Sequence, residues 1–424
     1  MKTKTGLARR TNPNTQTGCL RTACATRLLP LLLLLALPAA VKAQFTFTTN
    51  NGVITIIKYT GSGGAVTVPD TTNGWPVTSI GNGAFSNCTS LTSITIGTNV
   101  TSIENYAFYD CTSLTSVTIP NSVTNIGNLA FNFCASLTNA IIGNGVTSIG
   151  NYAFEICHRL TNVIIGTNVT NIGDYAFYDG YSLTSVVIPN SVTSIGENAF
   201  YWCSRLTSVT IGNSVTNIGE MAFSNCGSLT NVTIGTNVIS IGSDAFYDCT
   251  SLTSVAIPNR VNNIGSYAFY DCTSLTSVTI GNSVTNIGDF AFCGCTKLTG
   301  VYFQGNAPSV GPQVFAGDNN ATVYYLPGTM GWGTTFGGRP TVLWNPQAQQ
   351  DASFGVRTNR FGFNIIGSSN LVIVVEACTK LANPTWSPVG TNTLNTFIGT
   401  NGTSYFSDSQ WMNYPGRFYR FRSP

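Results

Sequence analysis

The chain has 424 residues, of which only 8% are charged, against roughly a quarter in an average soluble protein. With 43 glycines, an apolar fraction of 43% and a mean hydropathy of +0.16, it is too apolar to be disordered and too poor in charge to cover ordinary amphipathic helices. His158 is the one histidine, which excludes most acid–base and metal chemistry that relies on imidazole. We therefore expect no enzyme, no cofactor and no metal site.

The formal net charge of +3 arises from the N-terminal segment. Residues 1–43 hold seven of the 19 cations and no acidic residue, so the remainder has 12 cations against 16 acidic residues, a net charge of −4. Leu28 to Val41 is apolar but shorter than the roughly 20 residues of a membrane span, and small residues follow it. We predict a signal peptide cleaved between Ala43 and Gln44, with an uncleaved membrane anchor as the alternative. Export would place the protein in the medium or at the cell surface, associated with the outer membrane.

A repeat of 23 residues organises the chain. The dipeptide Ala-Phe recurs at this interval, with its phenylalanines at Phe85, Phe108, Phe131, Phe154, Phe177, Phe200, Phe223, Phe246, Phe269 and Phe292. In the unit that starts at Leu114, the L-x-x-L-x-L pattern predicts a short strand whose alternate residues face a stacked core. A second extended piece should end at Gly127, before the Ala-Phe turn. One unit cannot bury its apolar face alone, so we predict ten stacked rungs, a solenoid of about 45–50 Å at ~4.8 Å per rung.

These units read C-x-x-L-x-x-V-x-I-P-x-S-V-x-x-I-G-x-x-A-F, and over about residues 75–300 they resemble the BspA-type leucine-rich repeat family of bacterial surface proteins. The resemblance implies a β-rich leucine-rich repeat solenoid with short strands and little helix. It also implies a secreted or surface-attached interaction module, because some relatives adhere to host or matrix proteins. It does not identify the ligand.

The predicted domains follow from the repeat boundaries and from changes in composition. They are a signal peptide (1–43), an N-terminal β cap (44–74) with a hairpin at Asn51-Gly52, the repeats (75–300), a C-terminal cap (301–345) and a small all-β domain (346–424). In that last domain, residues 377–386 and 415–424 resemble C-terminal modules of exported Verrucomicrobia-type proteins. Its candidate glycan contacts are Trp386, Trp411 and Tyr414; the alternative is that these aromatics fill a small core.

A longer period, three repeats in length, overlies the single repeat. The tripeptide after each first strand cycles through Gly-Thr-Asn, Pro-Asn-Ser and Gly-Asn-Ser or its close variants, beginning at Gly97. The array therefore grew by duplication of triplets of repeats. A feature present three times suits a repeated contact surface better than one unique chemical site.

Eleven cysteines follow the predicted signal peptide, and nine occupy one position of the repeat. These nine are Cys88, Cys111, Cys134, Cys157, Cys203, Cys226, Cys249, Cys272 and Cys295. Neighbouring rungs would bring their Cα atoms to ~4.8 Å, within disulfide range, so bridges between rungs remain an alternative. We expect buried free thiols, because an in-register column repeats for packing. Neither Cys293-Gly-Cys295 nor His158 has partners at zinc-ligand spacing.

The acidic residues are scattered around the Ala-Phe turns, which favours turn capping and solubility, with weak calcium binding as the alternative. No opposed carboxylate pair of the glycosidase kind is evident. No phosphate-binding Gly-Lys motif is present either, and the acidic array argues against binding nucleic acid.

Threonine forms the most uniform column of polar residues beside the first strand. The candidate ligand-binding residues are Thr115, Thr138, Thr161, Thr184, Thr207, Thr230 and Thr253. One interpretation is strand propensity with hydroxyl contacts between rungs. The other is a neutral hydrogen-bonding face for an extracellular protein or polysaccharide.

The sequence thus predicts an exported, non-enzymatic solenoid that acts as a protein-binding or adhesion module at the cell surface. A structural surface-layer component without a specific ligand is one alternative. A carbohydrate-associated protein that acts through its C-terminal domain is the other. No transmembrane segment is expected in the mature chain, and the sequence does not determine its oligomeric state.

Overall fold

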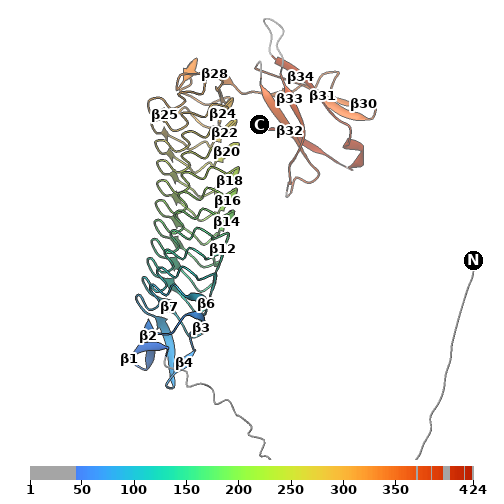
Figure 1. The fold of residues 1–424 in the computed structure, drawn as a ribbon. Helices are drawn as coiled ribbons and strands as arrows, with labels where there is room; N and C mark the ends of the chain where they lie inside the picture. Colours follow the sequence, from blue (N-terminus) through green and yellow to red (C-terminus); the bar gives the residue numbers. More distant parts are fainter. Residues whose placement is uncertain (1–43, 369–370, 383, 395–401, 415, 423–424) are drawn as a thin grey trace, which may run out of the picture. The chain divides into compact units, whose positions relative to one another are not determined.

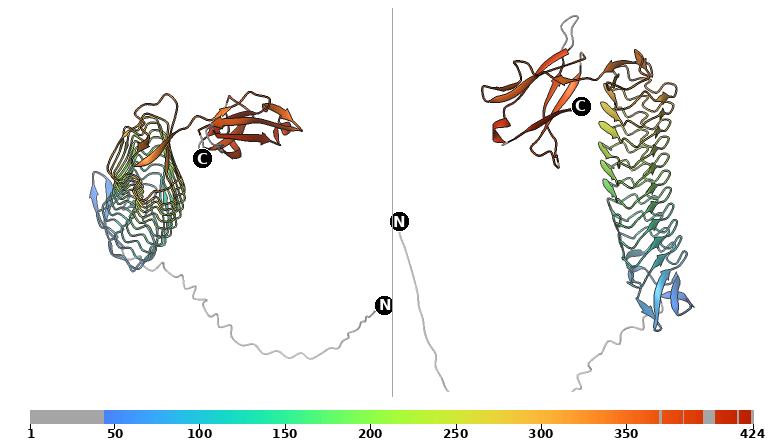
Figure 2. Two further views of the ribbon diagram at one scale, coloured as in Figure 1. Left: turned by 90° about the horizontal axis from the view of Figure 1, so that it is seen from above. Right: turned by 180° about the vertical axis from the view of Figure 1, so that it is seen from behind.

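The computed structural model describes residues 44–368, 371–382, 384–394, 402–414 and 416–422. The predicted signal peptide, including Ala43, lies outside this range. From Gln44 the chain builds a stack of rungs, here called the array, and the residues from about 346 build a small β module (Figure 1). Within the array, successive rungs lie almost directly over one another (Figure 2).

The array has one continuous sheet of 14 strands, in the order β1-β2-β5-β7-β9-β11-β13-β15-β17-β19-β21-β23-β25, with β4 paired to β5. Their bounds are β1 (Phe45–Asn50), β2 (Val53–Tyr59), β4 (Thr71–Thr72), β5 (Trp75–Ile80), β7 (Ser102–Ile103), β9 (Asn125–Ile126), β11 (Ser148–Ile149), β13 (Asn171–Ile172), β15 (Ser194–Ile195), β17 (Asn217–Ile218), β19 (Ser240–Ile241), β21 (Asn263–Ile264), β23 (Asn286–Ile287) and β25 (Ser309–Val310). All pairs along this path are parallel except the β1–β2 hairpin.

A second set of strands runs along another side of the array and is divided into separate sheets, β3-β6, β8-β10-β12, β14-β16-β18 and β20-β22-β24-β26-β28-β27. The bounds are β3 (Gly64–Thr67), β6 (Leu91–Thr95), β8 (Ser116–Ile119), β10 (Asn139–Ile142), β12 (Asn162–Ile164), β14 (Ser185–Ile188), β16 (Ser208–Ile211), β18 (Asn231–Thr233), β20 (Ser254–Ile257), β22 (Ser277–Ile280), β24 (Gly300–Phe303), β26 (Thr322–Tyr325), β27 (Thr335–Phe336) and β28 (Arg339–Leu343). We call the outward surface of this set the strand face.

The repeat length sets the register of the stack. Ser116 pairs with Asn139 and Ile119 with Ile142, in each case the equivalent position one repeat later. In β8 the burial alternates, so that Val117 and Ile119 enter the core while Ser116 and Thr118 stay outside. The predicted leucine-rich repeat solenoid is confirmed, with about 12 turns instead of ten, because strands on both sides of residues 75–300 continue the parallel pairing.

A ladder of phenylalanine rings fills the core. The phenylalanines that recur every 23 residues from Phe85 to Phe315 are fully buried. Each ring stacks on the next, with centroids 4.9–5.7 Å apart. Parallel stacks with this spacing are favourable when the rings are offset. The strict spacing of Ala-Phe is thus the sequence counterpart of one ring per rung.

In the continuous sheet, a glycine follows every two-residue strand from β9 to β25, and close packing between rungs requires it. A Cβ atom on Gly150 would lie 2.6 Å from the Gly127 carbonyl carbon one rung back, and one on Gly196 would lie 2.6 Å from the Asp174 nitrogen. Real Cβ atoms essentially never approach backbone that closely, so no other residue fits without separating the rungs. This is the physical reason for the glycine at which the second extended piece ends.

We call the Ala-Phe side of the array the turn edge, which in one rung is residues 128–136. Along this edge, backbone N–H groups donate alternately to the next rung and to a carbonyl of their own rung, so that the buried donors are paired. Leu129 and Phe131 donate to Asn151 and Ala153 of the next rung, at 2.9 and 2.8 Å, while Cys134 donates back to Phe131. Two positions per rung are left-handed, including Leu129 and Phe133, with φ of 54° and 59°. The sequence analysis did not anticipate bulky residues in this conformation.

The C-terminal β module has two sheets, β29-β31-β30 with β34 beside β31, and β33-β32-β35. Its elements are β29 (Gln347–Ala348), β30 (Gly355–Arg357), β31 (Arg360–Gly367), β32 (Val372–Cys378), β33 (Ser387–Thr393), β34 (Gly402–Asp408), the 3-10 helix η1 (Trp411–Asn413) and β35 (Phe418–Arg422). Phe363, Ile365, Ile373, Val375 and Phe406 are buried within it. It is all β apart from η1, as predicted.

Candidate functional site

The predicted threonine column lies exposed along the strand face, and its hydroxyl groups have a structural task. Each Oγ1 from Thr115 onward donates to the backbone carbonyl of the threonine one rung back, at 2.9–3.5 Å. This places Thr115, Thr138, Thr161, Thr184, Thr207, Thr230 and Thr253 in one row. Because each hydroxyl proton is already bound, the row presents methyl groups and acceptor lone pairs to a ligand, with no spare donor.

Apolar side chains interrupt the next outward row of the strand face. Thr118, Thr210 and Thr233 hold this position in several rungs, but Ile141, Ile164 and Val187 hold it in three adjacent ones. Ile141 is half-buried, whereas Ile164 and Val187 are 50% and 64% exposed. This patch could not be predicted from the residues that all repeats share, because it arises where individual repeats differ. The signal that would have found it is an aliphatic residue at a position that alternation assigns to solvent.

The strand face is divided into separate sheets, and one of the breaks lies between the strands that carry Ile164 and Val187. A new sheet begins at β8, β14 and β20, and each of these strands is followed by a proline, Pro120, Pro189 or Pro258. Proline has no N–H to donate, whereas the equivalent Gln304 donates to Ile280 at 2.9 Å. The period of three repeats in the sequence thus corresponds to three-stranded sheets.

A hollow of about 780 Å³ opens at the split between β12 and β14. Ile164 and Ile165 line it from one rung, and Val187 and Pro189 from the next. The Thr184 hydroxyl bond across this split measures 3.4 Å, near the long end of the column. An apolar floor bordered by Asn and Ser side chains resembles the centre of a protein-binding site more than it resembles a catalytic cleft.

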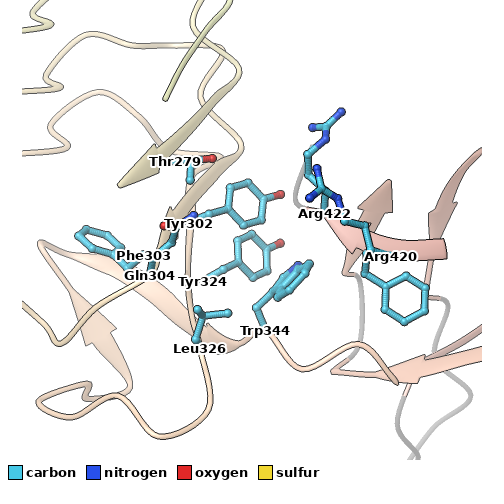
Figure 3. Close-up of a pocket in the computed structure, with 10 residues that line it drawn as sticks. Thr279, Tyr302, Phe303, Gln304, Tyr324, Leu326, Trp344, Arg420 and Arg422 are labelled. Carbon is cyan, nitrogen blue, oxygen red and sulfur yellow. The ribbon is translucent and has the colours of Figure 1, made fainter. Parts of the chain in front are cut away.

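The outward row ends in aromatic side chains. Tyr302 and Tyr324 follow Thr279 in register, and their rings stack with centroids 4.8 Å apart (Figure 3). Trp344 lies beside Tyr324 at the end of β28 (Figure 3). These residues fall within the predicted C-terminal cap, and Tyr302 and Tyr324 continue the outward row although both are buried.

All eleven cysteines of the described residues are free, and eight of the nine in the column are buried. Each thiol from Cys111 to Cys295 donates to the carbonyl oxygen of the preceding rung's phenylalanine, with Sγ–O distances of 3.1–3.4 Å. Burial raises the pKa of the Cys157 and Cys203 thiols to about 12. These thiols therefore stay protonated and unreactive at neutral pH.

This geometry predicts the outcome of a thiol titration. The unreduced mature chain should show eleven reactive thiols in guanidinium chloride, whereas the native chain near pH 7.5 should react slowly and mainly at the half-buried Cys88 and Cys293. A chromogenic disulfide reagent measures both. Fewer than three reactive thiols in the denatured chain would contradict it and favour bridges between rungs.

The repeat geometry agrees with a comparison of the sequence against known families. Residues 78–207 and 193–322 match the BspA type leucine rich repeat region, a pattern of six copies. The chain belongs to the BspA-type leucine-rich repeat family. No curated protein matches its sequence.

Three solved leucine-rich repeat structures are similar to this BspA-type chain. A cell surface protein of Faecalibacterium prausnitzii is 29% identical over 62% of this chain and 94% of that one, with a TM-score of 0.30. A T. pallidum protein is 28% identical over 49% and 88%, with a TM-score of 0.39. One from Bacteroides ovatus is 25% identical over 67% and 94%, with a TM-score of 0.36. TM-scores this low carry no argument about function.

His158 of the BspA-type array has a partner that its spacing did not reveal. Its Nε2 lies 2.9 Å from Asp179 Oδ2, in the adjacent rung. The sequence analysis found no partner because it considered metal-ligand and nucleophile spacings, whereas stacking joins residues about one repeat apart. Within the described ranges, no group of three His, Cys, Asp or Glu residues is placed to hold a metal ion.

Of the three candidate glycan contacts of the C-terminal module, Trp411 and Tyr414 lie at η1 and Trp386 directly precedes β33. The Trp386 ring has the Arg420 guanidinium over it at 4.5 Å, and Tyr414 has Arg417 over it at 4.4 Å. Trp411 is partly buried in η1. Arg420 and Arg422 also bind Glu376, at 2.8 and 2.7 Å. Trp386 and Tyr414 therefore each pack against a different arginine, Arg420 and Arg417.

Among the described residues of this BspA-type protein, the one helix is the short 3-10 helix η1. In the part of the chain that the structure describes, no helix is long and apolar enough to cross a membrane.

Proposed function

We propose that this chain is an exported module that binds a protein at the cell surface through its strand face, with the hollow at Ile164 and Val187 as the centre of contact. The observation that carries the proposal is the exposure of these two aliphatic side chains at a split in a surface whose outward positions are mostly Thr, Ser and Asn. Membership of the BspA-type family supports a binding role.

The partner should present an apolar side chain surrounded by backbone and amide groups. Ile164, Ile165 and Val187 supply an apolar floor, and truncation of such central residues typically costs far more affinity than changes at the rim. The rim residues Asn162 and Asn190 each carry both a donor and an acceptor, which suits hydrogen bonds to a protein backbone. The threonine column beside the hollow contributes acceptors.

The proposal includes the assignments made from sequence alone. Residues 1–43 are the signal peptide, cleaved between Ala43 and Gln44, and residues 346–424 form a separate module of the Verrucomicrobia type that retains the protein at the surface. Support comes from the apolar core of residues 28–41 and from the change of charge after residue 345. The alternatives of a surface-layer component and of glycan binding by the C-terminal module make different predictions.

Binding of the mature chain to immobilised extracellular matrix proteins tests the strand face. Val187→Arg, or Thr→Arg at Thr161, Thr184 and Thr207 together, should weaken every selective interaction at least tenfold, because each introduces a bulky charge at or beside the hollow. Thr147→Arg is the matched control, since Thr147 is exposed and precedes β11 of the continuous sheet.

Three outcomes separate the alternatives. Equal affinities of Val187→Arg and Thr147→Arg for every bound protein would sink the strand-face proposal. Self-association of the chain without selective binding would support the surface-layer role. Retention of binding by the C-terminal module alone would move the function to residues 346–424.

A further inference from the structure

Comparison of equivalent positions among the repeats shows which residues the stacking of rungs requires. After the column cysteine, most rungs carry Thr, Ser, Ala or Gly, but two adjacent rungs carry His158 and Tyr181. The residue before the cysteine is Asp, Asn or Gly in most rungs, but it is Phe133 and Ile156 in two rungs and Trp202 in the rung after Tyr181. Rungs without these residues stack with the same register, so folding does not explain the departures. They gather on one stretch of the turn edge.

Trp202 is the most unusual of them. Its backbone is left-handed, with φ of 59°, and its side chain is 50% exposed. Asn, Asp and Gly tolerate this conformation, which is why most other rungs use them, whereas a tryptophan there is strained. Other bulky residues, such as Leu129 and Phe133, adopt this conformation as well, so the feature that points to a role in binding is the exposed Trp202 indole beside a hollow.

A hollow of about 320 Å³ lies on the turn edge at Trp202. Asp179, Tyr181, Trp202, Ser204 and Asn225 line it, and these residues come from three consecutive rungs. The Ser204 hydroxyl is shielded and has no hydrogen-bond partner. Two exposed aromatic faces, a carboxylate, an amide and a hydroxyl thus converge in a space at the small end of ligand pockets.

The protein's own cations already occupy the positions that would attract a cationic ligand. The Arg205 guanidinium lies 4.9 Å from the centre of the Tyr181 ring, and His158 binds Asp179 Oδ2. The groups left for a ligand are the face of Trp202, the Asn225 amide and Asp179 Oδ1. They suit a molecule with an apolar face and a rim of hydroxyl groups.

We propose that this hollow is a binding subsite for a neutral saccharide. The C–H face of a pyranose ring packs on Trp202, and its hydroxyl groups donate to Asp179 and exchange hydrogen bonds with the Asn225 amide. The subsite lies on the turn edge, so it is separate from the protein-binding surface proposed for the strand face. It occurs once, because the residues that form it depart from the triplet duplication.

Affinity electrophoresis of the mature chain through gels containing dextran, mannan, xylan or soluble starch tests the subsite. At least one of these neutral polysaccharides should retard the wild-type chain, and Trp202→Asn should weaken that retardation at least tenfold. Asparagine is the residue that Asn225 supplies one rung on, so this variant retains a side chain that the left-handed backbone accepts. Phe133→Asn is the matched control, because Phe133 holds the same left-handed position three repeats earlier and its variant should bind like wild type.

The result that overturns the proposal is equal mobility of wild type and Trp202→Asn in all four gels. Retardation by polylysine instead, lost in Trp202→Asn, would also overturn it and assign the hollow to cationic side chains. Val187→Arg should retain polysaccharide binding, so failure of the strand-face proposal leaves this one standing.

Discussion

Replacing Phe200 with alanine should lower the free energy of unfolding of the array by about 3–5 kcal/mol, the range found for large-to-small changes at buried aromatic residues. Phe200 is fully buried, and its ring stacks on Phe177 and Phe223 at 5.1 and 5.2 Å. Loss of the ring leaves a cavity that neither neighbour can fill, because each is held in its own rung. Urea unfolding followed by circular dichroism measures the effect.

Two further variants serve as controls for the unfolding of Phe200→Ala. Thr210→Ala removes an exposed side chain from the strand face and should change the free energy of unfolding by no more than about 0.5 kcal/mol. Phe200→Leu retains most of the volume and should cost less than Phe200→Ala. If Phe200→Ala cost no more than Thr210→Ala, the continuous phenylalanine core would be wrong. Because rungs contact only their neighbours, a broadened transition is also expected.

Replacing Asp318 with asparagine should stabilise the end of the array at alkaline pH and have little effect in acid. Asp318 occupies the cysteine position of the last rung, one repeat after Cys295, and is fully buried with neither carboxylate oxygen hydrogen-bonded. Burial raises the pKa of Asp318 to about 7, although the nearby Arg339 guanidinium opposes the shift. An ionised carboxylate has no proton to donate, unlike the thiols of the column.

The direction of the pH dependence follows from this raised pKa. Between about pH 4 and 7 the unfolded chain has released the proton of Asp318 and the folded chain retains it, so folding becomes less favourable as the pH rises. Each pH unit in that window lowers the free energy of unfolding by about 1.4 kcal/mol. Ionisation of Asp318 therefore makes the folded array at most about 4 kcal/mol less stable at pH 8 than at pH 4. Asp318→Asn removes this cost and its pH dependence.

Amide hydrogen exchange across residues 311–325, together with urea unfolding at pH 4 and pH 8, measures the change. Asp289→Asn is the control, because Asp289 is an exposed carboxylate in the neighbouring rung. An equal gain for Asp318→Asn at both pH values would contradict the titration argument. An equal gain for Asp289→Asn at pH 8 would attribute the effect to net charge.

The repeat made the solenoid predictable from sequence to a degree that is unusual for a chain of this length. Leu114, Val117, Ile119, Phe131 and Cys134 recur at fixed offsets, and only parallel stacking in register with the repeat buries them all. The number of turns was underestimated, because the terminal rungs lack the full motif. Phe315 continues the core one repeat after Phe292, although it is preceded by Val and not by the Ala of the other rungs.

The candidate binding surfaces were harder to predict from the sequence than the fold. A column of threonines is evident in the repeat, but only the hydrogen bond of Thr138 Oγ1 to the Thr115 carbonyl shows that its donors are already used. The contact between His158 and Asp179 joins two adjacent rungs, a separation that no local motif encodes. Trp202 could have been recognised as a departure from its column, but its left-handed backbone and its hollow belong to the folded chain.

The sequence by itself determined the stack, because one apolar pattern repeated in register admits one way to bury its faces. It also determined a low charge, since short strands and turns rich in Thr, Ser and Asn cover the surface. Only the tertiary structure decided where that surface can bind. Neighbouring rungs place residues about one repeat apart side by side, so the split beside Val187 and the hollow beside Trp202 arise from contacts between repeats.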